Sequence, residues 1–469
     1  MSDSSFDLIV IGGGPAGYVA AIRASQLGMS VACVDKRDTL GGTCLNVGCI
    51  PSKALLNASQ KFAEAASGEL GELGIKLSSV KLDLYEMMSG KDKIVAGLTS
   101  GIDHLFKKNK ITRLTGSATI LSQGVLELTD GADKGRFTAE RILIATGSEP
   151  TSLPGLVIDE KKIVSSTGAI ALEKLPKKMM VIGAGYIGLE MGTVWSRLGT
   201  EVEVIEYLPR ILPGMDLEVA NKFMAMLTKQ GLKFHLGTAV KSAKSSRAGV
   251  ILTVADAKTG EEKDLSCDIA LVSIGRKPNT ENLGLETLGV EMTDRGQIAV
   301  DTDFETNIEG IFAVGDVIPG PMLAHKAEED AVAAVEIMAG QAGHVDYDLV
   351  PSIVYTAPEI ATLGATEEAL KESSIDYKKG VFPFLANSRA KATGHTDGFV
   401  KILADAKTDK VLGCHIIAHE AGTLIHEVAT AMAFGASSED IARTCHGHPT
   451  MNEAVKEAAL AVDGRAIHI

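Results

Sequence analysis

Residues 7–17 read DLIVIGGGPAG, an apolar run that leads into a glycine-rich turn, and an alanine-rich helical stretch follows as far as Leu27. A second apolar run, residues 31–34, ends at Asp35. Strand, G-x-G-x-x-G turn, helix, strand and acid in this order are typical of a dinucleotide-binding unit. The glycines permit a tight turn, close approach of a pyrophosphate and close helix packing. In this unit they are Gly12, Gly14 and Gly17.

The same pattern occurs a second time. An apolar run at 179–182 leads into a glycine turn and a helical stretch, and another at 202–205 ends at Glu206. The second set of glycines is Gly183, Gly185 and Gly188. In both units the acid follows the first glycine by 23 residues, close to the roughly 20 that ribose binding requires. Two dinucleotide sites are therefore predicted.

Each unit ends in another apolar strand, and these strands lead to Gly147 and Gly275. From first to closing glycine the units span 135 and 92 residues, so the first carries about 40 extra residues. Sites of different size suggest different cofactors. If a hydride passes between the two cofactors, FAD in the first unit and NAD in the second are the expected pair.

The extra residues include two cysteines, Cys44 and Cys49, in the run GGTCLNVGCIPSK. On a regular helix, positions five apart lie about 140° apart around the axis. If the pair closes a small disulfide ring, the backbone must be irregular, and Gly48 and Pro51 permit that. We expect a helix to follow over 53–62. Two structural thiols or a zinc site are the alternatives, and zinc lacks further ligands at suitable spacing.

Composition excludes several classes of protein. Of 469 residues, 45% are hydrophobic, which is enough to form packed cores. The net charge of −14 disfavours binding to nucleic acid or to an anionic membrane. Six cysteines are too few for a disulfide scaffold, and we expect no metal site. No targeting or membrane-spanning segment is expected, so we predict a bacterial cytoplasmic protein, or a mitochondrial matrix protein if the source is eukaryotic.

The cysteine run resembles the redox-active disulfide segment of the class I pyridine nucleotide–disulfide oxidoreductases, and the resemblance extends from Phe6 to Ile469. It implies that Cys44 exchanges with substrate sulfur and that Cys49 contacts the flavin. Lys53 would reach the flavin as well, paired with Glu190.

A further match is GIFAVGD, residues 310–316. In the family this aspartate binds the ribityl chain of FAD, which assigns that role to Asp316. The residues that follow resemble a segment whose backbone contacts the flavin ring, here Met322, Leu323 and Ala324. His325 is equally well explained as a structural residue.

Thiol–disulfide exchange needs a group that accepts and returns protons, and histidine suits neutral pH. The run CHGHPTMNE, residues 445–453, offers two histidines and a carboxylate. The His-Pro-Thr motif of the family matches His448, with Glu453 orienting its ring, while His446 would support them. In the family this base comes from the neighbouring subunit, which implies a homodimer.

The resemblance implies an α/β fold with two Rossmann-like domains and a C-terminal α+β interface domain. Four parts are predicted: an FAD-binding domain over 1–150 with the inserted redox helix, an NAD-binding domain over 151–279, a central domain over 280–350 that completes the FAD site, and an interface or dimerisation domain over 351–469. Strands near 398–403 and 411–417 and helices near 420–433 and 452–462 would belong to the last part.

Among family members, Glu206 favours those that use NAD, because an acid there repels the 2′-phosphate of NADP. The C-terminus has no cysteine pair. The pattern is most similar to members that oxidise protein-bound dihydrolipoamide, as the E3 component of 2-oxo acid dehydrogenase complexes or in glycine cleavage. Their partners are a lipoyl domain or H-protein and the E2 core. A glutathione reductase-like enzyme is the main alternative, and a flavin-bound sensor without turnover is a weaker one.

Overall fold

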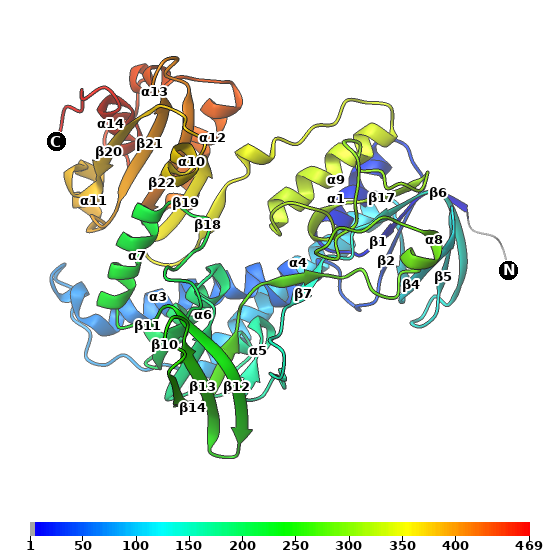
Figure 1. Ribbon diagram of the computed structural model, residues 1–469, viewed down its shortest axis with the longest axis horizontal. Coiled ribbons are helices and arrows are strands. Elements are labelled where there is room, and N and C mark those ends of the chain that lie inside the picture. The colour runs from blue at the N-terminus through cyan, green and yellow to red at the C-terminus, as the bar shows by residue number, and fades with distance from the viewer. Residues whose placement is uncertain (1–4) are drawn as a thin grey trace. The chain divides into compact units, whose positions relative to one another are not determined.

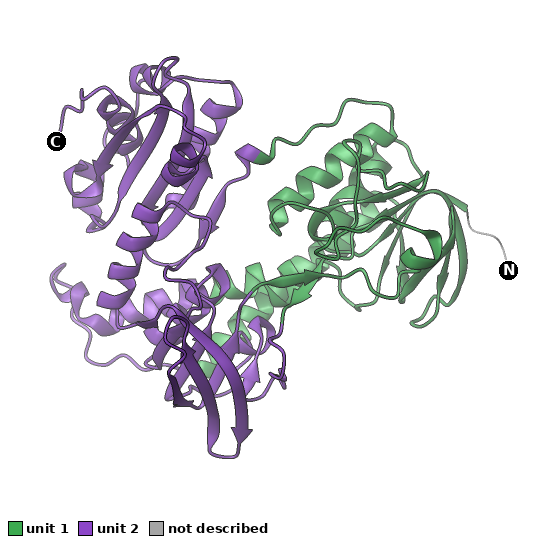
Figure 2. Ribbon diagram, in the orientation of Figure 1, with its two compact units in different colours: residues 1–55, 83–151, 275–347 green, residues 56–82, 152–274, 348–469 purple. Residues whose placement is uncertain are grey.

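The computed structural model describes residues 5–469. By contact density the chain forms two compact units, coloured separately in Figure 2. Unit 1 holds the described residues up to 55, together with 83–151 and 275–347. Unit 2 holds 56–82, 152–274 and 348–469. Residues 275–347 return to unit 1 because β17 pairs with a strand from its first half.

Unit 1 is built on a seven-stranded sheet in the order β3-β2-β1-β6-β5-β4, with β17 added beside β6. The pairs β1–β2, β1–β6, β2–β3 and β6–β17 are parallel, whereas β4, β5 and β6 form an antiparallel meander. The strands are β1 (Ser5–Ile11), β2 (Val31–Asp35), β3 (Thr112–Thr115), β4 (Ala118–Ser122), β5 (Val125–Leu128), β6 (Gly135–Ile144) and β17 (Ile311–Ala313).

Helices α1 (Pro15–Gln26) and α9 (Ala324–Met338) lie against each other beside this sheet (Figure 1). Their buried residues are mostly alanine, which lets two helices approach closely. The rest of unit 1 consists of short connections and one long helix. These are α2 (Gly42–Val47), the start of α3 (Cys49–Ser67), α4 (Leu84–Lys108), the ribbon β7 (Ser148–Pro150) with β16 (Arg276–Pro278), α8 (Leu285–Leu288) and the 3₁₀ turn η2 (Gly315–Val317).

The first half of unit 2 repeats the nucleotide-binding plan with a parallel sheet in the order β11-β10-β9-β15-β8. Its strands are β8 (Ile163–Val164), β9 (Lys178–Ile182), β10 (Glu201–Ile205), β11 (Lys233–His235) and β15 (Ile269–Val272). Helices α5 (Ser166–Ala169), α6 (Tyr186–Arg197) and α7 (Leu217–Lys229) accompany it. An antiparallel sheet interrupts it, made of β12 (Thr238–Ser246), β13 (Gly249–Asp256) and β14 (Glu262–Cys267).

The second half of unit 2 is an antiparallel sheet in the order β18-β19-β22-β21-β20 with helices packed against it. The strands are β18 (Ser352–Val354), β19 (Glu359–Gly364), β20 (Tyr377–Pro383), β21 (Phe399–Asp405) and β22 (Val411–Ala418). The helices are α10 (Glu367–Glu372), α11 (Ser388–Thr393), α12 (Ala421–Ala433), α13 (Ser438–Arg443) and α14 (Glu453–Ala461). Among residues 5–469, no helix combines the length and the apolar character needed to cross a bilayer.

The predicted α/β class with two Rossmann-like sheets is confirmed. The helix expected over 53–62 is confirmed and is longer than predicted, since α3 begins at Cys49 and runs to Ser67. Gly48 alone makes the break after α2, and Pro51 lies inside the first turn of α3. Proline is tolerated there because the N–H groups of a first helical turn have no intrahelical partner. The four-part division of the chain stays a prediction.

Candidate functional site

The first glycine turn lies between β1 and α1 and has no room for side chains at two of its positions. A Cβ at Gly12 would lie 2.3 Å from the Ala145 carbonyl oxygen, and one at Gly17 only 1.7 Å from the Gly12 oxygen. Gly14 is the N-cap of α1, where a Cβ would only touch Gly42 at 3.7 Å. The N-terminus of α1 can therefore be approached by a ligand, and its dipole favours an anion.

Asp35, at the end of β2, reaches back to this turn. Its Oδ2 accepts a hydrogen bond of 2.7 Å from the Gly13 N–H, and its Oδ1 accepts one of 2.8 Å from Arg37. The carboxylate is thus fixed beside the turn, where it can accept ribose hydroxyls.

The second turn, between β9 and α6, repeats this geometry. A Cβ at Gly183 would lie 2.5 Å from the Ser273 oxygen, and one at Gly188 would lie 2.2 Å from the Gly183 oxygen. At Gly185 a Cβ would meet nothing within 4 Å in the described chain, beyond its neighbours in sequence and helix. Glu206 accepts from the Ala184 N–H at 2.7 Å and from Leu208 at 2.8 Å. The open position at Gly185 suits a pyrophosphate.

The closing glycines both lie in unit 1. Gly147 and Gly275 have φ of +72° and +133°, which glycine adopts readily. The Gly147 oxygen accepts from the Asn279 N–H at 2.8 Å, and the Gly275 oxygen accepts from Thr151 at 3.0 Å. These bonds join the segment around Gly147 to the segment around Gly275, next to the paired strands β7 and β16.

The two cysteines flank the break between α2 and α3. Gly48 forms that break, and a Cβ there would lie 2.8 Å from the Thr43 oxygen. Both side chains are thiols in this structure, and the hydrogen bond with Cys49, together with burial, raises the pKa of Cys44. The positive charge of Lys53, one turn along α3, opposes that rise. Cys49 is exposed and begins α3, and a helix N-terminus favours thiolate.

Asp316 lies in η2 and takes part in a network that the sequence did not predict. It accepts a hydrogen bond of 2.5 Å from the Ser148 hydroxyl. Arg276 donates to the same hydroxyl at 2.7 Å and to the Ser148 carbonyl at 2.6 Å. Burial lowers the pKa of Arg276, and attraction to Asp316 opposes that change. The only sequence signal for Arg276 was its place directly after Gly275.

The turn before Asp316 is anchored by a buried ion pair on α9. Lys326 and Asp330 have fully buried side chains 2.7 Å apart. Asp330 accepts from the Gly315 N–H at 3.0 Å, and Lys326 donates to the Gly315 oxygen at 3.1 Å. The predicted flavin-contacting segment, Met322 to Ala324, leads into this helix, with Leu323 at its N-cap and His325 in its first turn.

The predicted acid–base pair lies in unit 2. His448 Nδ1 is 2.9 Å from Glu453 Oε1, and Glu453 Oε2 accepts from the Thr450 N–H at 2.9 Å. The His448 side chain is 70% exposed, so its ring can meet a reactant. Burial alone would raise the pKa of Glu453, but the bonds from Thr450 and His448 lower it overall. The contact with Glu453 fixes the orientation of the His448 ring.

Glu190 is also in unit 2, on α6, and is only 4% exposed. Its carboxylate accepts a hydrogen bond of 3.0 Å from the Tyr355 N–H. Its pairing with Lys53 stays a prediction.

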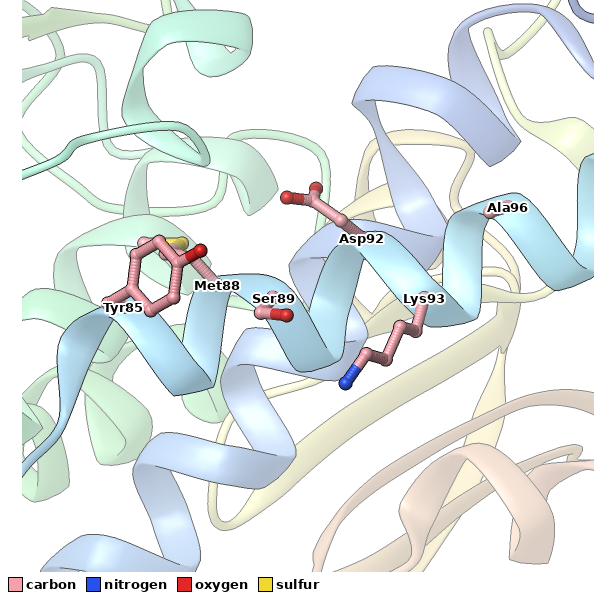
Figure 3. A pocket seen from close by; sticks show the side chains of 6 residues that line it. All are labelled: Tyr85, Met88, Ser89, Asp92, Lys93 and Ala96. Carbon is pink, nitrogen blue, oxygen red and sulfur yellow. The ribbon is translucent and has the colours of Figure 1, made fainter.

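One pocket is lined by residues of α4, and none of the groups described above lines it. Figure 3 shows its six lining side chains, which all come from that helix: Tyr85, Met88, Ser89, Asp92, Lys93 and Ala96. None of them is a predicted site residue, and a single helix face cannot enclose a ligand. Within residues 5–469, no group of three or more His, Cys, Asp or Glu is placed to hold a metal ion.

Comparison with known families identifies the arrangement. The model of the pyridine nucleotide–disulphide oxidoreductases matches residues 6–331, and the model of their dimerisation domain matches residues 350–459. The chain belongs to the pyridine nucleotide–disulphide oxidoreductase family. Membership confirms the prediction of a redox enzyme with FAD and NAD as cofactors. The dimerisation domain supports the predicted homodimer.

Individual relatives are similar over almost their whole length. The mitochondrial dihydrolipoyl dehydrogenase of Pisum sativum is 55% identical over 99% of this chain and 92% of its own. That of Sus scrofa is 52% identical over 98% and 92%. The crystal structure of LpdA from Mycobacterium tuberculosis is 26% identical, covers 97% of this chain and 99% of its own, and superposes with a TM-score of 0.89. The names of these relatives, which are mitochondrial, do not support the predicted bacterial cytoplasmic location.

Proposed function

We propose that this chain oxidises protein-bound dihydrolipoamide to lipoamide and reduces NAD, using the Cys44–Cys49 pair and FAD. The observation that carries the proposal is the pair itself, held across a helix break in the same unit as the first glycine turn. Relatives that are 52–55% identical over nearly the whole chain carry dihydrolipoyl dehydrogenase names, which supports this substrate.

The thiol half-reaction consists of two thiol–disulfide exchange steps. With the pair oxidised, a dihydrolipoamide thiolate attacks the Cys44 sulfur, the S–S bond breaks, and Cys49 leaves as a thiolate. The second lipoyl thiolate then attacks the lipoyl sulfur bound to Cys44, which closes the lipoamide ring and releases Cys44. Two electrons pass to the cysteine pair. His448 accepts the proton of the attacking thiol, and Glu453 holds its ring.

The residues fit FAD and NAD on structural grounds. Both turns leave the N-terminus of a helix open at Gly14 and Gly185, while Cβ atoms at the flanking glycines would overlap backbone atoms. When bound, FAD supplies a two-electron relay between a dithiol and a nicotinamide ring. Glu206 selects NAD, because its carboxylate accepts ribose hydroxyls and repels a 2′-phosphate.

The partners we propose follow from the substrate. Lipoamide is carried on a lipoyl domain or an H-protein, and the chain would act as the E3 component beside an E2 core. His448 would be supplied by the second subunit of the homodimer. A mitochondrial matrix location fits the names of the relatives.

The test is anaerobic reduction of the purified yellow protein by dihydrolipoamide, followed in the visible absorbance of the bound flavin. We expect the absorbance to change with dihydrolipoamide and to return when NAD is added. Cys44→Ser should keep its flavin and lose this response. A protein that responds to NADH but not to dihydrolipoamide would overturn the substrate assignment and favour another disulfide.

A further inference from the structure

His448 projects from a surface loop whose position depends on contacts with neighbouring elements. We define the His448 loop as residues 444–452, between α13 and α14. His448 itself is mostly exposed; Glu453 orients its ring and also accepts a hydrogen bond of 2.9 Å from the Thr450 N–H of the same loop. An exposed side chain on a surface loop loses precision unless the loop backbone is fixed.

Glu427, on α12, contacts this loop on both sides of His448. Its Oε1 lies 2.6 Å from His446 Nε2, and its Oε2 accepts a hydrogen bond of 2.6 Å from the Asn452 side-chain amide. One carboxylate thus holds residues that precede and follow the predicted base. Because α12 packs on β19 and β22, the carboxylate is carried by a rigid element.

The contact with His446 is strong and well shielded. The His446 side chain is only 6% exposed. Its other ring nitrogen, Nδ1, lies 2.9 Å from the Thr444 carbonyl oxygen. Both ring nitrogens therefore lie within hydrogen-bond distance of an oxygen atom, one on the loop backbone and one on α12. Hydrogen bonds accepted by a carboxylate are roughly twice as strong as those between neutral groups.

Other contacts bring the middle of the loop into the same arrangement. The Thr450 hydroxyl donates to the Gly447 oxygen at 2.8 Å, and the Asn387 amide donates to the Thr450 oxygen at 3.0 Å. These bonds hold the turn around His448, and Lys456 on α14 donates to the Thr444 carbonyl at the start of the loop at 3.2 Å. Only Glu427 joins His446 to Asn452 among the bonds of the described chain.

We propose that Glu427 is a positioning residue for His448, and this inference rests on the proposed function. It touches neither substrate nor cofactor. By holding His446 and Asn452 at a fixed separation, it presents the His448 ring to the thiol substrate. A displacement of about 1 Å in such a group is enough to cost roughly 100-fold in rate.

The experiment separates the two half-reactions in the intact holoenzyme. The rate of flavin reduction by dihydrolipoamide, measured by stopped flow, depends on proton transfer by His448. NADH oxidation with a dye as the electron acceptor does not require His448. We expect Glu427→Ala to slow the first by roughly tenfold to 100-fold and to leave the second within about twofold. Glu427→Gln should recover most of the rate, since its amide still accepts from His446 and can donate to the side-chain oxygen of Asn452.

Three further variants complete the design. Asn452→Ala should slow the thiol half-reaction, and combining it with Glu427→Ala should add little, because both remove the same restraint. Glu420→Gln, at the N-cap of the same helix, is the matched control and should behave as wild type. Melting temperatures check that each variant is folded.

Three results would overturn the inference. They are an unchanged thiol rate in Glu427→Ala, an equal loss in both assays, or a Gln variant as slow as the Ala variant. If the wild type oxidises NADH but is not reduced by dihydrolipoamide, the proposed function fails instead, and the two failures are distinct.

Discussion

Replacing Lys401 by methionine should destabilise unit 2 because it removes the centre of a buried charge cluster. The Lys401 side chain, on β21, is fully buried. Its Nζ lies 2.9 Å from Asp216 Oδ2, 2.5 Å from Glu367 Oε2 and 3.2 Å from Glu218 Oε2. Asp216 also caps α7, accepting from the N–H groups of its first turn. The cluster therefore joins α7 to the antiparallel sheet.

Removing one partner of a buried ion pair typically costs about 3–5 kcal/mol. Glu367 keeps bonds to Tyr377, Lys371 and Lys379 in the variant, so part of the charge stays compensated. Asp216 is fully buried and loses its only cationic hydrogen-bond partner among the described side chains. We therefore expect a loss near the lower end, about 3 kcal/mol in the free energy of unfolding.

The assay is urea unfolding of the holoenzyme under reducing conditions, comparing the first transition with that of Lys407→Met. Lys407 is exposed on the turn after β21, so its replacement should change the free energy by less than about 0.5 kcal/mol. Combining Lys401→Met with Asp216→Asn should cost less than the sum of the single changes, because the second removes the stranded charge. A Lys401→Met protein within about 1 kcal/mol of the Lys407 control would refute the reasoning.

Acid should weaken the same cluster: burial alone raises the pKa of Glu367, but hydrogen bonds led by Lys401 lower it overall. The contribution of Glu367 to the free energy of unfolding is present above the ordinary Glu pKa of about 4.3 and is lost as pH falls toward the lowered pKa. Urea midpoints should therefore drop between about pH 4 and 2, and they should drop less steeply in Lys401→Met. Plots of midpoint against pH that run parallel for the two proteins would contradict this. Gly185→Ala should keep the wild-type melting temperature yet weaken NADH binding in a fluorescence titration. Gly188→Ala should lower the melting temperature, because of the two new Cβ atoms only the one at position 188 would overlap backbone. Equal melting temperatures for the two variants would argue against this geometry. Glu206→Ala should reduce the preference for NADH over NADPH by roughly tenfold in kcat/KM, and an unchanged ratio would exclude ribose contact as its role.

The nucleotide turns could be predicted because their chemistry is local. Gly12 and Gly17 lie within one turn and helix, and the spacing of such residues fixes their geometry. Asp35 was predictable for the same reason, since it ends the strand that pairs with β1. The start of α3 was not, because Pro51 signals a break in sequence but is equally compatible with a first helical turn.

Residues that act through distant partners escaped prediction. Arg276 meets Ser148 across more than a hundred residues of chain. Lys401 is an ordinary charged residue in a strand pattern until folding places it beside Asp216. Glu427 has no motif around it, and its contacts to His446 and Asn452 follow from where α12 packs.

The sequence by itself determined the two dinucleotide turns, the cysteine pair and the His448–Glu453 motif, because each lies in one short segment whose spacing dictates its geometry. Tertiary structure alone decided that β17 joins the first sheet beside β6, that Lys401 becomes the buried centre of three carboxylates, and that Glu427 holds both sides of the His448 loop. Such contacts join segments far apart in the chain, and burial gives them a strength that the same charges lack in water.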